Sequence, residues 1–330
     1  MLNDKSILIT GGTGSFGNYF TEYILKHYSP KKIVIYSRDE FKQFNMQQKF
    51  ADYKKTMRYF IGDVRDEARL RRAFEGIDYV IHAAAMKQVP ACEYNPNEAI
   101  KTNVHGAMNV IEAALDTGVK RVVALSTDKA VNPVNLYGGT KLVSDKLFIA
   151  ANAYSGHKDT RFSIVRYGNV AGSRGSVIPF FANKIAEGCT ELSITDFEMT
   201  RFWISLDEGV QLVIKALEEA KGGETFISKI PSFKITELAK AMLPGCALKE
   251  IGIREGEKLH EVMITKEDSS HTYEYDKHFV IYPHMEWWSP DKAVSGGKLV
   301  ERGFEYNSGT NTEWLSVEQL QTILKDVEEH

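Results

Sequence analysis

The stretch STDKAVNPVNLYGGTK, residues 126–141, holds two pairs of side chains suited to acid–base chemistry. Tyr137 and Lys141 lie four residues apart, so on a helix they share a face and the lysine charge can lower the pKa of the tyrosine. A tyrosinate of this kind can take a proton from a hydroxyl group while a hydride leaves the same carbon. Asp128 and Lys129 add a second acid and a second base, which predicts a reaction that involves more than hydride transfer. A surface ion pair after a strand end is the alternative interpretation of Asp128 and Lys129.

A glycine-rich loop near the start of the chain has the spacing expected of a phosphate-binding turn. The segment TGGTGSFG, residues 10–17, follows an apolar run that predicts a strand and precedes an amphipathic stretch that predicts a helix over 15–28. Gly11, Gly14 and Gly17 allow the backbone to turn tightly and to approach a pyrophosphate, which the free N–H groups of the helix terminus then bind. The motif therefore predicts a dinucleotide site, with an ordinary tight turn as the alternative.

The residues after the second predicted strand bear on which dinucleotide is bound. That strand, residues 32–37, runs into YSRDE, so Ser37 and Arg38 are followed by Asp39 and, three residues on, Lys42. Arg38 can make charge-assisted contacts to a 2′-phosphate, which favours NADP over NAD. Asp39 is the kind of acid that binds the ribose hydroxyls of NAD, and a solvated surface role for Arg38 also stays open.

Short apolar runs alternate with longer amphipathic stretches through the first half of the chain, which predicts a parallel sheet covered by helices on both faces. We expect an α/β, Rossmann-type doubly wound sheet with a smaller, interleaved C-terminal substrate domain. The expected boundaries are 1–172 for the nucleotide-binding domain, with about 206–230 returning to it, and 173–330 for the substrate domain and tail. The expected strands are 6–10, 32–37, 57–64, 78–85, 121–127, 161–170 and, late in the chain, 224–229; the expected helices include 15–28, 66–75, 96–117, 137–155, 206–220 and 234–243.

Composition excludes several other classes of protein. The chain of 330 residues is 43% hydrophobic with a net charge of −3, and no basic stripe or reader motif predicts binding to nucleic acid. Its three scattered cysteines predict reduced thiols in a cytoplasmic protein, and we expect no signal peptide or membrane span. His82 and His260 stand without a ligand cluster, so we interpret them as structural and expect no catalytic metal.

The motifs taken together resemble a known family. GGTGSFG, YSRDE, IGDVRD, HAAAMKQVP, STDKA, NLYGGTK, RYGNVAGSRGSVIPFF, MTRFWI and GIREGEKLHEVM look like the inverting UDP-N-acetylglucosamine 4,6-dehydratases of the extended short-chain dehydrogenase/reductase superfamily. The resemblance covers about residues 5–265 and weakens in the tail. Retaining dehydratases of the superfamily carry Asp-Glu near the position where this chain has Asp128 and Lys129.

The resemblance implies a redox-neutral cycle with inversion at carbon 5 of the sugar. A hydride leaves carbon 4 for NADP, water is lost across carbons 5 and 6, and the hydride returns to carbon 6. Tyr137 would take the carbon 4 hydroxyl proton, Thr127 would bind the sugar there, and a protonated Asp128 would donate to the departing hydroxyl. Lys129 would be the carbon 5 base, which requires a neutral amine; we expect Lys141, the nicotinamide charge and desolvation to lower its pKa.

The resemblance and the strand order also imply two sets of binding residues. For the cofactor they are Gly11, Thr13, Gly14, Ser15, Phe16, Gly17, Ser37, Arg38, Asp39, Lys42, Asp63, Val64, Ala83, Ala84, Tyr137 and Lys141. For the UDP-sugar they are Lys87, Asn169, Arg174, Thr195, Arg254 and Glu257. A salt link on the domain surface is the alternative for Arg254 and Glu257.

Two other functions are compatible with the same fold. A UDP-sugar 4-epimerase would use Tyr137 and Lys141 but release an isomer, and a non-catalytic NADP-binding sensor would bind cofactor without turnover. For the dehydratase, the resemblance implies UDP-N-acetylglucosamine as substrate, the first step of pseudaminic acid or a related surface-sugar pathway such as flagellin glycosylation, and a homo-oligomer, either a dimer or a hexamer.

Overall fold

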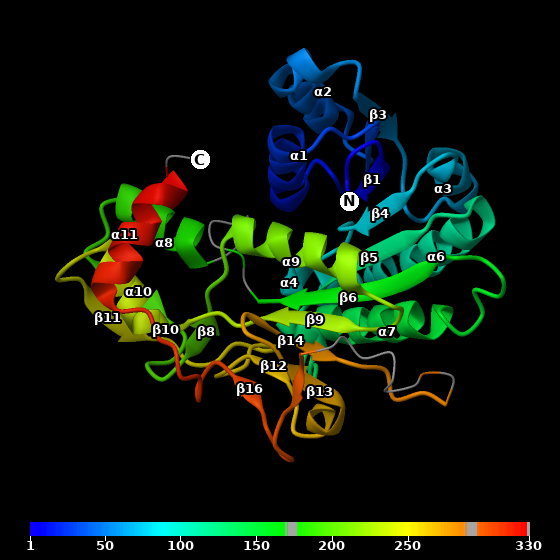
Figure 1. The fold of residues 1–330 in the computed structure, drawn as a ribbon. Coiled ribbons are helices and arrows are strands. Elements are labelled where there is room, and N and C mark those ends of the chain that lie inside the picture. The colour runs from blue at the N-terminus through cyan, green and yellow to red at the C-terminus, as the bar shows by residue number, and fades with distance from the viewer. Residues whose placement is uncertain (169, 171–176, 287, 289–295, 329–330) are drawn as a thin grey trace.

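The computed structural model describes residues 1–168, 170, 177–286, 288 and 296–328. Within these residues the main feature is a ten-stranded sheet with the order β15-β13-β14-β9-β6-β5-β4-β1-β2-β3 (Figure 1). Its strands are β1 (Ser6–Thr10), β2 (Lys32–Ser37), β3 (Met57–Ile61), β4 (Tyr79–His82), β5 (Arg121–Thr127), β6 (Arg161–Tyr167), β9 (Thr225–Ser228), β13 (Thr272–Glu274), β14 (His278–Ile281) and β15 (Lys298–Leu299). The strands from β3 to β9 in this order pair in parallel, which confirms the Rossmann-type α/β fold.

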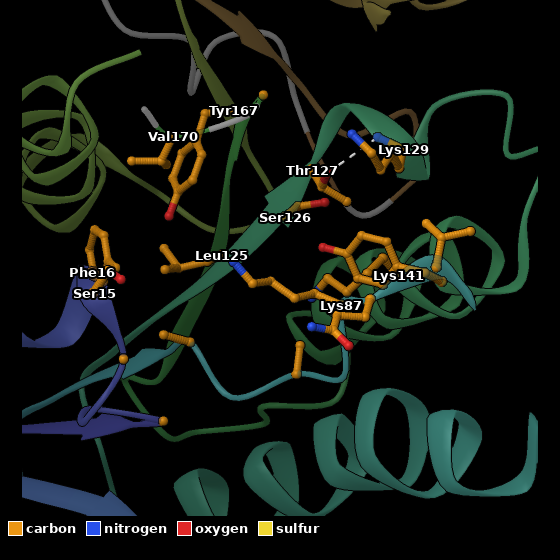
Figure 2. Close-up of a pocket in the computed structure, with 18 of the residues that line it drawn as sticks. Ser15, Phe16, Lys87, Leu125, Ser126, Thr127, Lys129, Lys141, Tyr167 and Val170 are labelled. Carbon is orange, nitrogen blue, oxygen red and sulfur yellow. Dashed lines mark hydrogen bonds between the residues drawn. The ribbon is translucent and has the colours of Figure 1, made fainter. Parts of the chain in front are cut away.

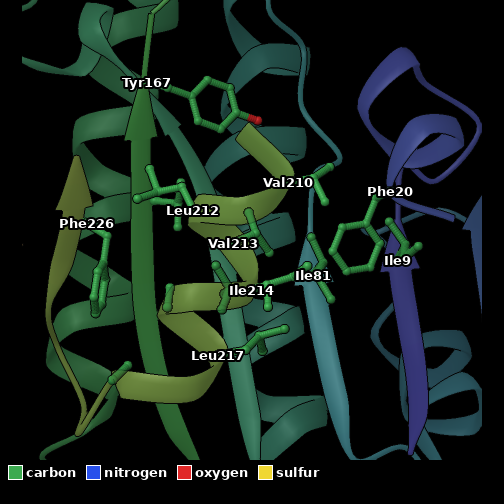
Figure 3. Close-up of a cluster of buried hydrophobic side chains, with 14 of the residues drawn as sticks. Ile9, Phe20, Ile81, Tyr167, Val210, Leu212, Val213, Ile214, Leu217 and Phe226 are labelled. Carbon is green, nitrogen blue, oxygen red and sulfur yellow. The ribbon is translucent and has the colours of Figure 1, made fainter. Parts of the chain in front are cut away.

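Helices cover both faces of the parallel part of the sheet, as the continuous apolar strands predict. Alternate residues of β1 divide between the two cores: Ile7 and Ile9 belong to one, and Leu8 to the other. The first core includes side chains of α1 (Ser15–His27), α2 (Glu40–Lys49) and α9 (Leu206–Glu219), and Figure 3 shows α9 running along the strands with Val213 and Leu217 toward them. The second includes side chains of α3 (Glu67–Phe74), α6 (Gly106–Thr117) and α7 (Leu136–Ala151).

The expected helix over residues 96–117 is interrupted in the structure. It consists of α5 (Pro96–Ile100), a π-helical turn η2 (Lys101–His105) and α6, and it follows the short helix α4 (Val89–Tyr94). The turn brings Asn103 against the loop after β4, where its side chain both accepts from the Met86 N–H at 2.8 Å and donates to the Met86 carbonyl at 2.9 Å. A π-turn inside a helix often lies at a functional site, and this one fixes the loop that carries Lys87.

The second half of the chain divides between the main sheet and a smaller body. β9 pairs in parallel with β6, and α9 packs beside it, so residues 206–228 lie with the first half of the chain. Most elements of the smaller body contribute side chains to a third apolar core. Its elements, with the connecting strands, are α8 (Val177–Ala186), β7 (Glu191–Ile194), β8 (Thr200–Phe202), β10 (Ser232–Lys234), α10 (Ile235–Met242), β11 (Ala247–Glu250), β12 (Val262–Ile264), β16 (Tyr306–Asn307) and α11 (Val317–Glu328).

Part of the C-terminal tail joins the main sheet, which the sequence analysis does not predict. β14 pairs antiparallel with β9, β13 pairs with β14, and β15 pairs with β13. These strands cover the edge of β9, which would otherwise leave its backbone N–H and C=O groups unpaired. The aromatic residues of this region belong to a core: the rings of Tyr282 and Trp288 are 5.0 Å apart and pack against the first apolar cluster. Among the described helices, none is long and apolar enough to cross a membrane.

Candidate active site

A cleft of about 1350 Å³ lies at the carboxyl ends of the parallel strands, where ligands bind in sheets of this topology. Figure 2 shows Ser15 and Phe16 on one side, Thr127 and Lys129 on the other, and Lys141 between them. Most of the residues predicted for the site line this cleft: Gly11, Thr13, Gly14, Ser15, Phe16, Gly17, Ser37, Arg38, Asp39, Lys42, Asp63, Val64, Ala83, Ala84, Lys87, Thr127, Lys129, Tyr137, Lys141, Thr195, Arg254 and Glu257. Asn169 and Arg174 lie outside the described residues.

The glycine loop has the close packing that its sequence predicts. Gly11 has a φ of +65°, and a Cβ at this position would come within 2.8 Å of the backbone of Ala84. A Cβ on Gly17 would overlap the Gly12 carbonyl, so α1 packs directly on the turn. Gly14, the residue before α1, contributes no side-chain cap, so the first N–H groups of the helix stay available to an anion. The loop therefore fits the pyrophosphate of a dinucleotide.

Arg38 and Asp39 differ in how firmly the protein holds them. The Asp39 carboxylate caps α2 by accepting from the Lys42 N–H at 2.9 Å, and it pairs with the Lys42 ammonium at 3.0 Å. The Arg38 side chain is 59% exposed and approaches Asp63 at 3.6 Å. Asp63 is bound more closely by Arg65, at 2.7 Å. The carboxylate that would bind a ribose is therefore engaged by its own helix, while the guanidinium stays accessible to a ligand.

Tyr137 and Lys141 lie in the first turns of α7. Asn135 caps this helix by accepting from the Gly138 N–H at 2.8 Å, and both functional side chains are buried. Burial raises the pKa of Tyr137 to about 12, and the charge of Lys129 and hydrogen bonding with Thr127 oppose that rise. The four-residue spacing predicts that Lys141 supplies this opposing charge. The structure corrects that prediction, because Lys129 is the main cation that acts on the tyrosine.

Lys129 is flanked by two carboxyl groups. Its Nζ lies 3.1 Å from Asp128 Oδ1 and 3.3 Å from Glu261 Oε1, and its side chain is 21% exposed. Burial acts to lower the pKa of Lys129, but the charges of Asp128 and Glu261 outweigh it and raise the pKa above its usual value. The prediction that the pKa of Lys129 is lowered is therefore wrong. That prediction rests on Lys141, the cofactor and desolvation, and the second carboxylate, Glu261, reverses it.

Asp128, which is predicted to donate a proton to the departing hydroxyl, lies behind the cleft wall and does not line the cleft. It is 1% exposed, and Oδ1 accepts from the Thr127 hydroxyl at 2.9 Å and from the Lys129 ammonium at 3.1 Å. Both of these partners line the cleft, so Asp128 reaches it through them. Burial raises the pKa of Asp128, and the nearby charge of Glu261 adds to the rise. A carboxyl group with a raised pKa is suited to donating a proton, which agrees with the role predicted for it.

Glu261 is the main member of the site that the sequence analysis missed. It directly precedes β12, is 3% exposed and lines the cleft. Although burial acts to raise the pKa of Glu261, the charges of Lys129 and Arg201 lower it overall. A glutamate 132 positions after Lys129 carries no local signal of this contact. The signal available was its place in GIREGEKLHEVM, among the motifs that carry the resemblance.

The segment that holds Arg254 and Glu257 is tied to the catalytic helix. Asn135 Nδ2 donates to the Gly256 carbonyl at 2.7 Å, which fixes this segment beside the start of α7. The side chains of Arg254 and Glu257 lie 4.0 Å apart. The surface salt link that is the alternative interpretation of these residues is therefore present, at a long distance. Glu257 Oε2 is buried and has no hydrogen-bond partner within the described part of the chain, which leaves an acceptor available to a ligand hydroxyl.

The two histidines are structural, as their isolation in the sequence predicts. The ring of His82 is buried on β4, with Nδ1 at 2.8 Å from the Thr10 hydroxyl. His260 contacts the Thr200 hydroxyl at 2.8 Å, and Gly309 packs on its ring. Over the described residues, no group of three or more His, Cys, Asp or Glu side chains gathers in a way that could hold a metal ion.

Comparison with known proteins decides the family. The model of a family described as polysaccharide biosynthesis protein matches residues 7–283. The chain belongs to this family. It is 56% identical to a UDP-N-acetylglucosamine 4,6-dehydratase (inverting) of Campylobacter jejuni, and the match covers 99% of each chain. It is also 42% identical to a UDP-glucose 4-epimerase of Rickettsia akari, over 98% of this chain and 96% of the relative.

Solved structures agree with this membership. The X-ray structure of Pen from Bacillus thuringiensis is 40% identical to the chain and superposes with a TM-score of 0.90 over 99% of each chain. DesIV, a dTDP-glucose 4,6-dehydratase from Streptomyces venezuelae solved with NAD and TYD bound, is 25% identical with a TM-score of 0.69, over 77% of this chain and 86% of that one. Members of this fold class therefore include enzymes that bind a nicotinamide dinucleotide.

Proposed function

We propose that the protein is a UDP-N-acetylglucosamine 4,6-dehydratase that inverts carbon 5 of the sugar. The observation that carries this proposal is a second acid–base group, Asp128 and Lys129, beside Tyr137 and Lys141 at one cleft. A dehydration needs an acid for the leaving hydroxyl and a base for the neighbouring carbon, in addition to the groups that handle the hydride. The 56% identity to a relative with this activity in its name supports the same conclusion.

The residues present fit a bound NADP, which would accept the hydride from carbon 4 and return it to carbon 6. The glycine loop would hold the pyrophosphate at the start of α1, and Arg38 would pair with the 2′-phosphate. Lys141, 3% exposed, would donate to the nicotinamide ribose. Burial lowers the pKa of Lys141, while the charge of Asp145 opposes that shift.

The chain's own residues then divide the proton transfers. Tyr137 takes the proton of the carbon 4 hydroxyl, assisted by the charge of Lys129 and by Thr127. Lys129 removes the carbon 5 proton after it has given up its own extra proton. Asp128, which lies directly behind Thr127 and Lys129, supplies the proton for the departing hydroxyl, which requires the protonated form of its carboxyl group. Lys87, Thr195, Arg254 and Glu257 would hold the UDP-sugar, together with Asn169 and Arg174.

The product, UDP-2-acetamido-2,6-dideoxy-β-L-arabino-hex-4-ulose, would place the enzyme at the first step of pseudaminic acid or related surface-sugar synthesis. The reaction would class the enzyme as a lyase. We further expect it to act as a homo-oligomer.

A UDP-sugar 4-epimerase is the second candidate, because a relative at 42% identity carries that name. An epimerase needs Tyr137 and Lys141, but its reaction has no step that requires a second acid and base such as Asp128 and Lys129. Incubation with UDP-N-acetylglucosamine and mass spectrometry separates the two. Loss of one water supports the dehydratase, and an unchanged mass with a new sugar isomer supports the epimerase. Binding of NADP without turnover of any UDP-sugar would instead favour a non-catalytic sensor.

A further inference from the structure

Glu261 is held in place by the C-terminal tail. The Ser308 hydroxyl accepts from the Glu261 N–H at 2.9 Å, and the Ser308 N–H donates to the Glu261 carbonyl at 2.8 Å. Ser308 is fully buried and its hydroxyl also contacts Thr200 at 2.8 Å. These bonds use the backbone of Glu261 and leave its carboxylate directed at Lys129 and Arg201. The tail, which lies beyond the part of the chain that carries the family motifs, therefore fixes a charge at the cleft.

The two carboxyl groups beside Lys129 have unequal support. Arg201 lies 3.7 Å from Glu261, and the charge of Lys258 also acts on Glu261. Arg201 donates to the backbone carbonyls of Thr200 and Leu259. Lys258 donates to the backbone carbonyl of Val131. Asp128 has a single ion-pair partner among the described residues, the Lys129 ammonium that it shares with Glu261. Glu261 therefore has Arg201 and Lys258 in addition to its share of the ammonium, whereas Asp128 has no ion pair besides that ammonium in the described part of the chain. Because a buried charge loses its hydration, the less compensated of the two carboxyl groups is the one that retains a proton.

Each of the two carboxyl groups has one oxygen without a hydrogen-bond partner in the part of the chain that the structure describes. Oδ1 of Asp128 receives both donors, whereas Oδ2, like Oε2 of Glu261, is buried and has no hydrogen-bond partner within the described residues. Gly168, a residue of the cleft wall, packs close to Oδ2, because a Cβ added at Gly168 would lie 3.2 Å from this oxygen. Electrostatic interactions also link Asp128 to Tyr137 of α7 and to Lys258, and Lys129 to Lys87 of the loop after β4. Because Asp128 has fewer ion-pair partners than Glu261, it is the carboxyl group that is better suited to carry a proton on its unpartnered oxygen.

We propose that Glu261 is a positioning residue: its carboxylate shares the Lys129 ammonium with Asp128, so that the three groups together hold two protons and Asp128 carries one of them. The proposal rests on the function proposed above and adds to it a reason why the acid is in its protonated form. The raised pKa of Asp128 and the lowered pKa of Glu261 agree with this distribution.

Glu261 also provides the acceptor that Lys129 needs. One N–H bond of the Lys129 ammonium breaks and an O–H bond forms on Glu261 across the 3.3 Å contact. The freed electron pair of the amine then takes the carbon 5 proton of the oxidised sugar. The number of protons on Asp128, Lys129 and Glu261 is unchanged by the first of these steps. No oxidant or reductant is needed beyond the bound dinucleotide.

Infrared spectroscopy of the purified enzyme tests the resting distribution without any substrate. We expect wild type to show a carbonyl band of buried, protonated carboxylic acid near neutral pH. Asp128→Asn should lose the component of this band that belongs to Asp128, and a component from the buried Asp145 or Glu224, whose pKa values burial also raises, would be unchanged. Glu261→Gln should lack the Asp128 component as well, because Lys129 then pairs with Asp128 alone and ionises it. Glu267→Gln, an exposed carboxylate on the same segment, is the matched control and should keep it. A band that persists in Glu261→Gln at the wild-type intensity would overturn the proposal.

Single-turnover kinetics with UDP-N-acetylglucosamine give a second, independent measurement. In Glu261→Gln, hydride transfer from the sugar to bound NADP should proceed within about 3-fold of the wild-type rate. Water loss should be slower by about 10²–10⁴-fold, the range of a lost acid–base contribution. Glu261→Asp should recover part of that loss. An equal loss of both steps would indicate a structural role and contradict the proposal. If wild type itself fails to turn over this substrate, the proposed function fails while the infrared result still decides the role of Glu261.

Discussion

The α-carbon of Gly138 packs against the backbone carbonyl of Lys129: a Cβ at residue 138 would overlap that oxygen. The helix that carries Tyr137 therefore rests directly on the turn that carries the second lysine. Gly139, the next residue, is different, since a Cβ there would meet no atom within 4 Å in the described structure. Two adjacent glycines in one helix thus have opposite tolerance to a methyl group.

This contrast makes a pair of matched substitutions informative. Gly138→Ala should lower the free energy of unfolding by about 1–3 kcal/mol through overpacking, and it should also reduce dehydration because Lys129 is displaced. Gly139→Ala should raise the free energy of unfolding by about 0.5–1 kcal/mol through helix propensity and leave activity near wild type. Urea unfolding and steady-state rates measure both effects. Similar behaviour of the two variants would contradict the packing described here.

Lys129→Met should separate hydride transfer from dehydration. The substitution keeps a side chain of similar length but removes the amine, so the carbon 5 proton has no base. We expect the absorbance of reduced nicotinamide to rise on mixing with UDP-N-acetylglucosamine and to persist, with water loss slowed by about 10²–10⁴-fold. Because Lys129 also lowers the pKa of Tyr137, the first step should slow by a smaller factor. Dehydration at the wild-type rate would remove Lys129 from the mechanism.

Arg38→Ala tests the choice of dinucleotide. A charge-assisted contact to a 2′-phosphate is worth about 1.5–3 kcal/mol, so the Kd for NADP should rise by roughly 10- to 100-fold. The Kd for NAD serves as the internal control and should change little, because NAD lacks that phosphate. Calorimetric titration with both nucleotides gives the comparison. Equal weakening of both would show that Arg38 does not select NADP.

His82 should make stability depend on pH. Burial lowers the pKa of His82 from 6.5 to about 3, with the charge of Lys141 contributing. The folded-state pKa is depressed, so this contribution to stability is complete above pH 6.5 and is lost as pH falls toward 3. Between pH 7 and pH 5 the free energy of unfolding should drop by about 2 kcal/mol from this group.

The comparison for that prediction is His82→Asn, which keeps a polar atom near Thr10 but does not titrate. The variant should be less stable at pH 7 and should lose less stability on acidification. Urea unfolding of both proteins at pH 7 and pH 5 supplies the four values required. Parallel losses in wild type and variant would show that His82 is not the titrating group.

The features that could be predicted from the sequence depend on residues that are close together along the chain. The strand before Gly11, the helix after it and the four-residue spacing of Tyr137 and Lys141 are local patterns, and the fold preserves them. The charge state of Lys129 depends instead on Glu261 and Arg201, which the chain brings to the cleft from strands far along the sequence. No periodicity or spacing encodes such a contact.

The tail and the interrupted helix show a second limit. β13, β14 and β15 are two to four residues long, too short for a clear alternation, and they form because β9 offers an unpaired edge. The π-turn around Asn103 depends on hydrogen bonds to Met86, a partner in another loop. In each case tertiary contacts determine the local structure, and these contacts were not part of the pattern from which the elements were predicted.

The stereochemistry of the product tests the central claim most directly. The purified enzyme is incubated with UDP-N-acetylglucosamine in deuterated water, and the sugar is followed by NMR. We predict a 4-keto-6-deoxy sugar of L-arabino configuration, with deuterium from solvent at carbon 5. A D-xylo ketone, which retains carbon 5, or a 4-epimer that keeps its carbon 6 hydroxyl would contradict the assignment of Lys129 and Asp128 as the groups that invert and dehydrate the sugar.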